Sequence, residues 1–183
     1  GTAGLRGALG AGPNRMNRVV VGRAAAGLAA YLNEQVGPGG SVVIGFDARK
    51  NSDVFARDTA EIMTGAGIKA FLMPSPLPTP LLAFSIRELG CAAGVMVTAS
   101  HNPPQDNGYK VYLGDGSQIV APADAQIAAH IAAVGPLPEV PRGSGGTVPD
   151  HSIVDTYLDT LADLATDGPR GLPVVYTPMH GVG

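Results

Sequence analysis

An alternation of short apolar runs with longer amphipathic segments constrains the fold of this chain most strongly, and it extends from residue 41 to residue 100. Each run is apolar at consecutive positions and ends in a turn, which is typical of a strand covered on both faces. The runs are "SVVIGFDAR" (41–49), "KAFLM" (69–73) and "AAGVMVTA" (92–99). Apolar residues at helical spacing predict helices over 17–32, 52–67 and 80–90. We therefore expect an α/β fold: an open, three-layer αβα domain with a mostly parallel, mixed sheet.

Local signals predict further elements. Ser52 precedes a helical pattern and is expected to act as its N-cap. Asp106-Asn107-Gly108 is by itself a turn signal. Two short β-prone pieces within 109–120 flank Gly114-Asp115-Gly116, which favours a hairpin. Residues 122–134 are expected to form one more helix.

The distribution of proline and glycine predicts a domain boundary. Residues 1–136 are expected to form the first domain, and the Pro- and Gly-rich residues 137–150 a linker. Residues 151–183 then begin a second, similar domain, with a helix over 151–165 and a new strand from residue 172. Because a unit that stops at its first strand cannot bury both faces of a sheet, we expect the chain to be a piece of a longer protein.

Composition narrows the class of protein. Of the 183 residues, 45% are hydrophobic, which supports a real core, and the net charge is −3 with no long basic run, so nucleic acid is not expected as a partner. The single cysteine, Cys91, excludes an internal disulfide. No apolar run reaches the length of about 18 residues that a membrane helix needs. The sequence thus predicts a cytoplasmic protein that does not enter a membrane.

Polar residues follow the predicted strands where each strand ends. In open α/β sheets, ligands bind beyond the carboxyl ends of the strands, and those ends share one rim if the strands are parallel. There Arg49 offers a planar cation for a phosphate, Ser100 a hydroxyl and His101 a donor beside it. Lys110 follows in the next strand and could point back to the same place. These residues indicate an anion or phosphate site with a candidate nucleophile, and they leave the reaction open.

Two other site classes fit less well. A Ser/His hydrolase would need a G-x-S-x-G elbow, and residues 98–102 lack both glycines. His101 is also badly placed to deprotonate Ser100, because adjacent side chains on an extended backbone point to opposite sides. A metal centre built from histidines and cysteine would need a ligand spacing that the sequence does not have. The residues concerned are His101, His130, His151, His180 and Cys91.

The sequence resembles the α-D-phosphohexomutases, the phosphoglucomutase/phosphomannomutase family. "TASHNP" (98–103) looks like the phosphoserine loop of that family, and "GTAGLRG" (1–7) is similar to its N-terminal active-site loop. "GFDAR" (45–49) resembles its Gly-x-Asp-x-Arg strand end, and "NGYKVY" (107–112) its lysine-bearing segment. "YTPMHGVG" (176–183) looks like the opening of its second domain. The order and spacing of these segments make the resemblance specific to the N-terminal portion of the family.

The resemblance implies roles for individual residues. Ser100 would be the residue that is phosphorylated, Lys110 a general acid/base, and Arg6 and His101 neighbours of the phosphoserine. The expected phosphate- and substrate-binding residues are Arg6, Arg49, Thr98 and Asn102. The phosphate on Ser100 would bind Mg²⁺, whose remaining ligands are expected beyond Gly183. The chain would also contact the C-terminal domains of the same protein.

The resemblance also implies a reaction. Phosphate would move between the 1- and 6-positions of mannose or glucose, with hexose phosphate as substrate and hexose 1,6-bisphosphate as intermediate. A phosphopentomutase of the same family and a non-catalytic, phosphate-binding mutase-like domain are the alternatives. The 183 residues alone are expected to be inactive, since the metal-binding loop of the family is absent from them.

Overall fold

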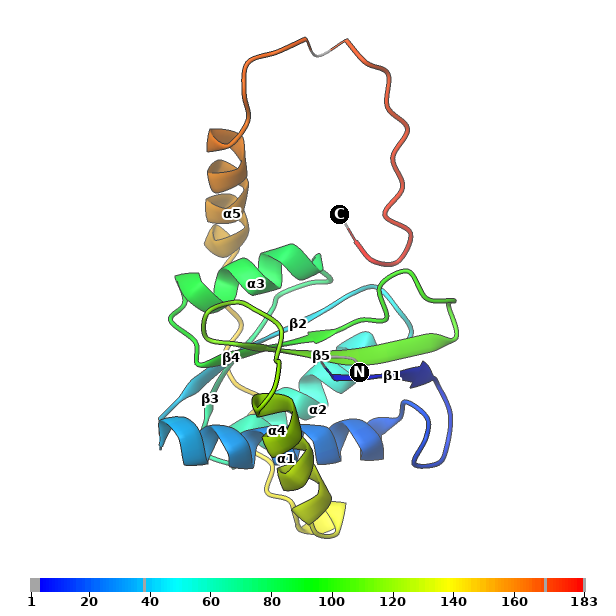
Figure 1. Cartoon of the computed structure of the whole chain (residues 1–183), viewed down its shortest axis with the longest axis vertical. Coiled ribbons are helices and arrows are strands. Elements are labelled where there is room, and N and C mark those ends of the chain that lie inside the picture. Colours follow the sequence, from blue (N-terminus) through cyan, green and yellow to red (C-terminus); the bar gives the residue numbers. More distant parts are fainter. Residues whose placement is uncertain (1–3, 38, 170, 183) are drawn as a thin grey trace.

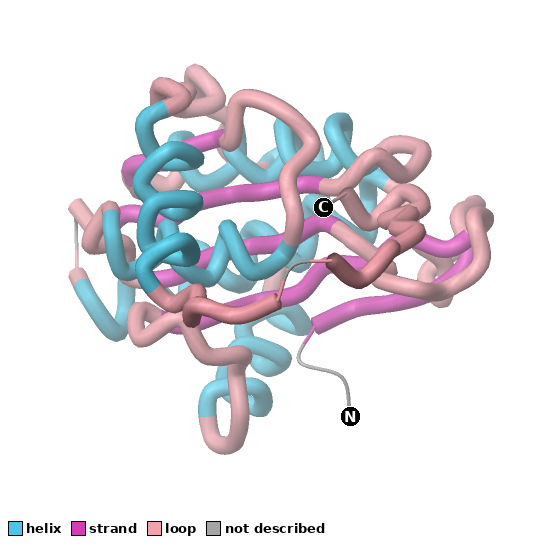
Figure 2. The backbone as a smooth tube through the Cα atoms, turned by 90° about the horizontal axis from the view of Figure 1, so that it is seen from above, coloured by secondary structure: helices cyan, strands magenta, loops and turns pink. Residues whose placement is uncertain are grey.

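A five-stranded mixed sheet forms the centre of the computed structural model, which describes residues 4–37, 39–169 and 171–182 (Figures 1 and 2). The strand order is β1-β5-β4-β2-β3. The strands are β1 (Gly4–Ala8), β2 (Ser41–Phe46), β3 (Lys69–Leu72), β4 (Ala93–Val97) and β5 (Asp106–Leu113). Strand β2 pairs in parallel with β3 and β4, whereas β5 pairs antiparallel with β4 and with β1. The three predicted parallel strands and the mixed character of the sheet are confirmed.

Helices cover both faces of this sheet, which gives the predicted three layers (Figure 1). On one face lie α1, α2 and α4; on the other lies α3, with α5 packed against it. The helices are α1 (Arg18–Val36), α2 (Ser52–Gly65), α3 (Thr79–Glu88), α4 (Ala123–Ala133) and α5 (Ser152–Asp163), with a 3₁₀ turn, η1, at Leu137–Glu139. Helix α1 begins after Asn17, whose side-chain oxygen accepts hydrogen bonds from the N–H groups of Val19 and Val20.

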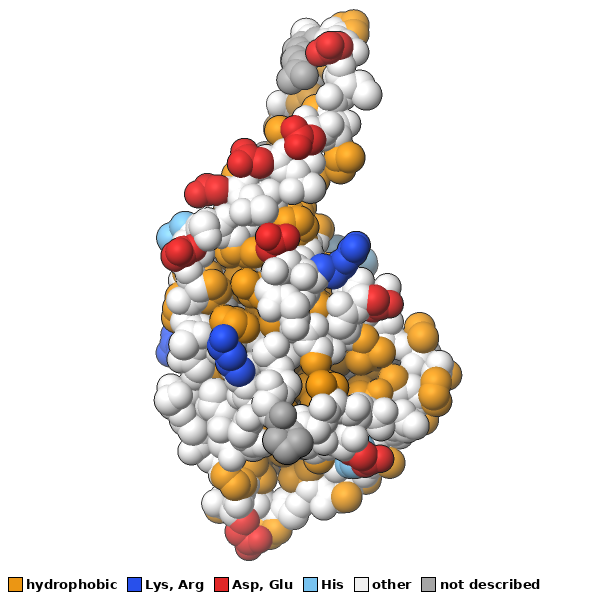
Figure 3. All heavy atoms as spheres, turned by 90° about the vertical axis from the view of Figure 1, so that its left-hand side faces the viewer, with side chains coloured by type: hydrophobic (Ala, Val, Ile, Leu, Met, Phe, Trp, Pro, Cys, Tyr) orange, Lys and Arg blue, Asp and Glu red, His pale blue; other side chains and the backbone are white. Residues whose placement is uncertain are grey.

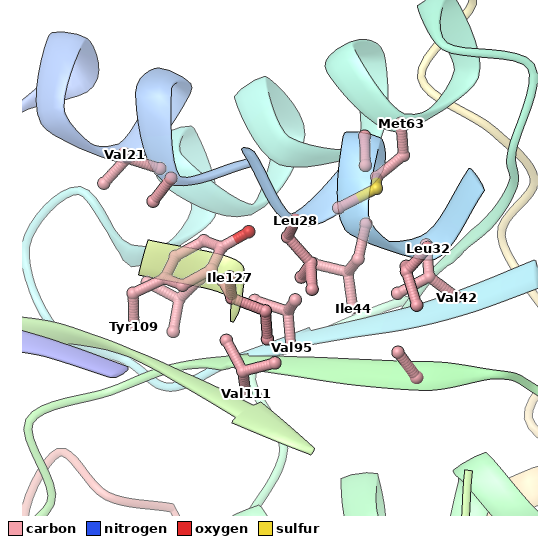
Figure 4. Close-up of a cluster of buried hydrophobic side chains, with 14 of the residues drawn as sticks. Val21, Leu28, Leu32, Val42, Ile44, Met63, Val95, Tyr109, Val111 and Ile127 are labelled. Atoms are coloured by element: carbon pink, nitrogen blue, oxygen red, sulfur yellow. The ribbon is translucent and has the colours of Figure 1, made fainter. Parts of the chain in front are cut away.

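The core explains why the strands are apolar at consecutive positions. Val42 and Ile44 of β2 belong to the cluster that α1, α2 and α4 close, and Figure 4 shows both among its side chains. Val43, between them, belongs to the opposite cluster, with Leu82 and Ile86 of α3. Because side chains alternate between the faces of a strand, a sheet covered by helices on both sides needs apolar residues at every position.

Three local predictions differ from the structure. Asp106-Asn107-Gly108 is not a turn but the start of β5, where Asn107 is fully buried. Ser52 is not the N-cap of α2, because Asn51 takes that position and the Ser52 hydroxyl donates to Asp47 instead. The turn after β5 is present, but the predicted second hairpin strand is reduced to one bridge between Tyr112 and Gln118.

The segment predicted as an N-terminal active-site loop is largely a strand. Gly4–Ala8 form β1, which pairs antiparallel along β5 with Arg6 opposite Gly108. Gly1–Ala3 of that segment lie outside the described residues. The edge strand thereby carries the Arg6 side chain on a rigid base instead of a loop.

The residues predicted as a linker lie along the body of the domain. Thr147 exchanges backbone hydrogen bonds with β3, accepting from Leu72 and donating to Ala70, both at 2.9 Å. Arg142 reaches the buried carboxylate of Asp58 on α2 at 2.8 Å, where Arg18 of α1 also binds at 2.7 Å. This segment therefore ties α1 and α2 to the outer edge of the sheet.

Beyond this segment, helix α5 is held at its N-terminal half. Ile153 is buried, and the Tyr157 ring packs edge-on against Phe84 of α3 at 5.4 Å. Leu161 and Leu164, farther along the chain, are exposed, and Figure 3 shows acidic side chains along this projecting helix. The strand predicted from residue 172 is not formed in the described residues 171–182. The start of a second domain thus stays a prediction.

Among the described residues, no helix is both long enough and apolar enough to span a membrane.

Candidate active site

The ends of β2 and β4 lie side by side, as expected for parallel neighbours. The N–H of Asp47, just after β2, donates to the Val97 carbonyl at the end of β4 at 3.1 Å. The loop of residues 98–105 leaves this rim and returns as β5. The sheet thereby brings the polar residues that follow β2 next to the loop that carries Ser100.

Ser100 has an uncommon backbone conformation. Its φ is 56°, in the left-handed region that non-glycine residues rarely adopt. Its N–H donates to the Thr98 hydroxyl at 2.9 Å, and the N–H of Asn102 donates to the Ala99 carbonyl at 3.0 Å. A left-handed residue persists only where its surroundings over-determine it, so the loop holds the Ser100 side chain in a fixed direction.

Lys110 contacts the serine hydroxyl directly. It lies on β5 opposite Met96 of β4, and its Nζ donates to Ser100 Oγ at 3.1 Å. Partial burial lowers the pKa of Lys110, the nearby charge of Arg6 lowers it further, and Asp47 acts in the opposite direction. The neutral amine is therefore easier to reach than in a free lysine, which is what a proton acceptor needs.

Arg6 contacts the loop through Asn102. Its NH1 donates to Asn102 Oδ1 at 3.1 Å, and Asn102 in turn donates to Asp106 Oδ2 at 2.9 Å. Among the described residues no carboxylate forms an ion pair with Arg6. Its charge is thus available to an anion on Ser100.

Arg49 is buried, and its hydrogen bonds go to the loop. NH2 donates to the carbonyls of Ser100 (2.6 Å) and Asn102 (2.7 Å). NH1 donates to the carbonyls of Pro103 (2.9 Å) and Asp106 (3.1 Å). Nε lies 3.3 Å from Asp47 Oδ2. The four carbonyls use the four N–H donors on NH1 and NH2, and the fifth donor, on Nε, is buried facing Asp47 without an aligned hydrogen bond, so the phosphate contact predicted for Arg49 has no exposed free donor in this structure.

Thr98 and His101, which were also predicted for the site, have different surroundings. Thr98 is buried, and its hydroxyl accepts the Ser100 N–H, so it supports the loop from within. His101 is exposed and makes no side-chain hydrogen bond or ion pair with any residue that the structure describes. Of the residues predicted for the site, Lys110 contacts the Ser100 side chain and Arg6 contacts the Asn102 side chain. Arg49 and Thr98 contact the backbone of the same loop.

A buried polar network behind Arg49 was missed by the sequence reasoning. Asp47 accepts the Ser52 hydroxyl at 2.7 Å and the N–H of Arg49 at 3.1 Å. The Asn107 amide donates to Ser52 Oγ and to the Lys50 carbonyl, both at 3.0 Å. Asp47 and Arg49 are separated by two positions just after a buried strand, and this spacing, which puts both side chains on one side, is the signal that could have found the pair.

The described residues alone do not make a metal centre. No group of three His, Cys, Asp or Glu side chains among them is arranged to hold a metal ion. The Ser100 loop offers one hydroxyl oxygen and a cationic surrounding, which suits an anion and not a bare cation. A Mg²⁺ site thus needs ligands that these residues do not provide.

Comparisons with known proteins show which family the chain resembles. The family model described as "Phosphoglucomutase/phosphomannomutase, alpha/beta/alpha domain I" matches residues 1–136. A "Probable phosphomannomutase" of Haemophilus influenzae is 56% identical over 173 residues, covering 92% of this chain and 36% of that protein. A "Phosphoglucomutase" of Staphylococcus haemolyticus is 38% identical, covering 100% of this chain and 35% of that protein. A "Probable phosphoribomutase" of Schizosaccharomyces pombe is 40% identical, covering 100% and 33%.

Solved structures show the same fold. A protein of Thermus thermophilus, described as a "putative phosphomannomutase", superposes with a TM-score of 0.80 at 33% identity, covering 91% of this chain and 36% of that one. The chain spans about a third of the length of the curated relatives it matches. The family match, the identity to these mutases and the shared fold together show that this chain belongs to the phosphoglucomutase/phosphomannomutase family, of which it carries the α/β/α domain I.

Proposed function

We propose that this chain is the phosphoserine-bearing part of a phosphosugar mutase, which moves phosphate between the 1- and 6-positions of mannose or glucose phosphates. The observation that carries the proposal is the 3.1 Å hydrogen bond from Lys110 Nζ to Ser100 Oγ, on a loop whose backbone is fixed. Family membership supports phosphoryl transfer over the other reactions that a serine and a lysine can perform. Positioning and charge are most of what this reaction asks of a protein.

In the proposed reaction, Ser100 starts as a phosphoserine. A hydroxyl of the bound hexose phosphate attacks the phosphorus, a new sugar O–P bond forms, and the bond from Ser100 Oγ to phosphorus breaks. The product in the site is hexose 1,6-bisphosphate, which turns over and returns its other phosphoryl group to Ser100 Oγ. One phosphoryl group leaves and one returns in each cycle, so the enzyme ends as it began.

Lys110 is assigned to proton transfer in both phosphoryl-transfer steps of the cycle. Its amine takes the proton of the oxygen that attacks and gives it to the oxygen that leaves, so it also ends each step unchanged. The contact at 3.1 Å supports this role at the serine oxygen, and the lowered pKa of Lys110 supports it chemically. The amine therefore has to serve the sugar hydroxyl and the serine oxygen in turn. No histidine–aspartate base is needed.

Arg6 and Asn102 are proposed to meet the phosphate. The Arg6 guanidinium would stabilise the charge on the transferring group, and Asn102, which accepts from it, would keep it aimed at the loop. His101 is exposed beside Ser100 and is proposed as a further donor to the phosphate or the sugar. Thr98 is proposed to act on the loop and not on the ligand, since its hydroxyl accepts the Ser100 N–H.

Mg²⁺ is proposed as the cofactor, with the phosphate on Ser100 as one ligand. The ion would offset negative charge on that phosphate. Its other ligands would come from parts of the full-length protein other than the residues described. For the same reason we expect the 183-residue chain alone to be inactive and to form its substrate site together with further domains.

A phosphopentomutase is the second candidate, and the 40% identity to a "Probable phosphoribomutase" over the whole chain favours it. A phosphate-binding domain without chemistry is the third, and the direct contact between Lys110 and Ser100 argues against it. Assays of the full-length protein on mannose 1-phosphate, glucose 1-phosphate and ribose 1-phosphate decide among them. Turnover of a hexose phosphate at the highest kcat/KM supports the first candidate, preference for ribose 1-phosphate the second, and no turnover of any the third.

A further inference from the structure

We propose that Arg49 is a positioning residue that fixes the Ser100 loop for phosphoryl transfer and does not bind the phosphate. The proposal rests on the mutase function proposed above, and it differs from the phosphate contact that the sequence suggested for Arg49. It follows from where the donors of the guanidinium point and from what holds the guanidinium itself.

The loop needs an outside donor for its carbonyls. Two of its residues, Pro103 and Pro104, have no N–H, so the loop cannot pair all its backbone groups internally. Three of its carbonyls, those of residues 100, 102 and 103, converge on the Arg49 guanidinium at 2.6–2.9 Å, together with the carbonyl of Asp106 at the start of β5 at 3.1 Å. One of them belongs to Ser100 itself, whose left-handed backbone these contacts help to hold.

The guanidinium is itself held from behind. Asp47 Oδ2 and Arg49 Nε are both buried without a well-aligned hydrogen bond, but they face each other at 3.3 Å as an ion pair. The other Asp47 oxygen accepts from the Ser52 hydroxyl at the start of α2, which Asn107 of β5 also contacts. The network therefore fixes the loop relative to β2, α2 and β5, and β5 is the strand that carries Lys110.

This arrangement divides the work between two arginines. The charge of Arg49 is offset by a buried carboxylate at 3.3 Å; four of its donors are taken by backbone carbonyls, and the fifth is buried facing that carboxylate. Arg6 pairs with no carboxylate among the described residues, so it acts on the phosphate directly. Loss of Arg49 should thus move the phosphoserine out of line and leave sugar-phosphate binding largely intact.

The test is Arg49→Lys in the full-length protein, with Arg57→Lys as the matched control. A lysine has three donors without a planar fork, so it cannot serve four carbonyls and Asp47 together. Within the part of the chain that the structure describes, Arg57 pairs only with Asp53, on the exposed side of α2. We expect kcat of Arg49→Lys to fall by about 100-fold, the effect of a displacement of roughly 1 Å, with KM for the sugar phosphate within about threefold. Hydrogen exchange should rise at residues 99–106 and stay unchanged in α1.

Several outcomes separate the possibilities. An unchanged kcat in Arg49→Lys, or a rise in KM with kcat retained, overturns the proposal, and the second result would make Arg49 a ligand of the phosphate. If Arg49→Lys does not fold, Ser52→Ala decides, because it removes only the hydroxyl behind Asp47; the proposal requires a loss in kcat of at least about threefold at unchanged KM. If the wild-type protein turns over no sugar phosphate, the proposed mutase function is wrong. If the wild-type protein is active and Arg49→Lys is equally active, only the positioning role of Arg49 is wrong.

Discussion

Replacing Lys110 separates its proton-transfer role from a purely electrostatic one. Lys110→Arg keeps a positive charge next to Ser100 but cannot lose it, because a guanidinium stays protonated in proteins. Lys110→Ala removes the charge and the proton carrier together. The two variants in the full-length protein therefore bracket the role that the 3.1 Å contact between Nζ and Ser100 Oγ suggests.

The size of the effect follows from this single contact. General acid–base catalysis by one positioned side chain contributes about 100- to 10,000-fold, or roughly 3–5.5 kcal/mol of barrier. We expect both variants to lose kcat within this range, and Lys110→Ala to lose more, since it also removes charge beside the phosphate. KM should change by less than about threefold, because the role belongs to the transition state. Lys69→Ala, at the opposite end of the sheet, should change neither by more than about twofold.

The pH profile gives the sharpest readout. A proton acceptor must be neutral, so kcat/KM rises with pH as Lys110 loses its proton, and burial and Arg6 lower the pKa at which this happens. In Arg6→Gln the repulsion from a second cation is gone, so the rising limb should move to higher pH. In Lys110→Arg the limb should disappear. Stopped-assay rates across pH measure both, and a Lys110→Arg profile identical to wild type would refute the assignment.

Two further predictions concern stability, measured by thermal unfolding of the 183-residue chain. Asp58→Ala leaves Arg18 and Arg142 without their shared carboxylate, and because both are partly exposed we expect a loss of about 2 kcal/mol. Burial opposes ionisation of Asp58, but the two arginines outweigh burial and hold its pKa below the ordinary 3.8. The difference in unfolding free energy between wild type and Asp58→Ala should therefore be largest near neutral pH and should shrink as the pH falls below about 4. A difference that does not change with pH would contradict the ion pairs. Gly108→Ala places a Cβ 2.5 Å from the Thr98 carbonyl oxygen and 2.9 Å from that of Leu5, so we expect a loss of about 2–3 kcal/mol, whereas Gly135→Ala, with open space, should be neutral.

The sequence was sufficient to predict the layers of the fold, and it also led to a candidate place for the site. Consecutive apolar positions in β2 and β4 require cover on both faces, and that requirement leaves few arrangements other than a sheet between helices. The rule that sites lie at the carboxyl ends of such strands then led to Ser100. Lys110 also followed, because the short loop after β4 has to return through a neighbouring strand.

Other features depend on contacts that no local pattern contains. Asn107-Gly108 has the composition of a turn, yet Asn107 is buried in β5. Its amide donates hydrogen bonds to Ser52 and Lys50, which are far away in sequence. Gly108 fits between two backbone carbonyls, where any side chain would collide. Arg49 looked like a phosphate ligand because an arginine at a strand end usually has free donors, and only the folded loop shows that its donors are taken. Tertiary hydrogen bonding overrode the local signal in each case.

The most direct measurement is the intact mass of the full-length protein after incubation with hexose 1,6-bisphosphate. The account predicts a species heavier by one phosphate that disappears when hexose phosphate is added in excess and never forms in Ser100→Ala. A matched variant, Ser117→Ala, alters a serine in the turn after β5 and should load normally. Phosphate that persists in Ser100→Ala, or a wild-type protein that never carries any, would contradict the claim that this hydroxyl accepts and returns the phosphoryl group.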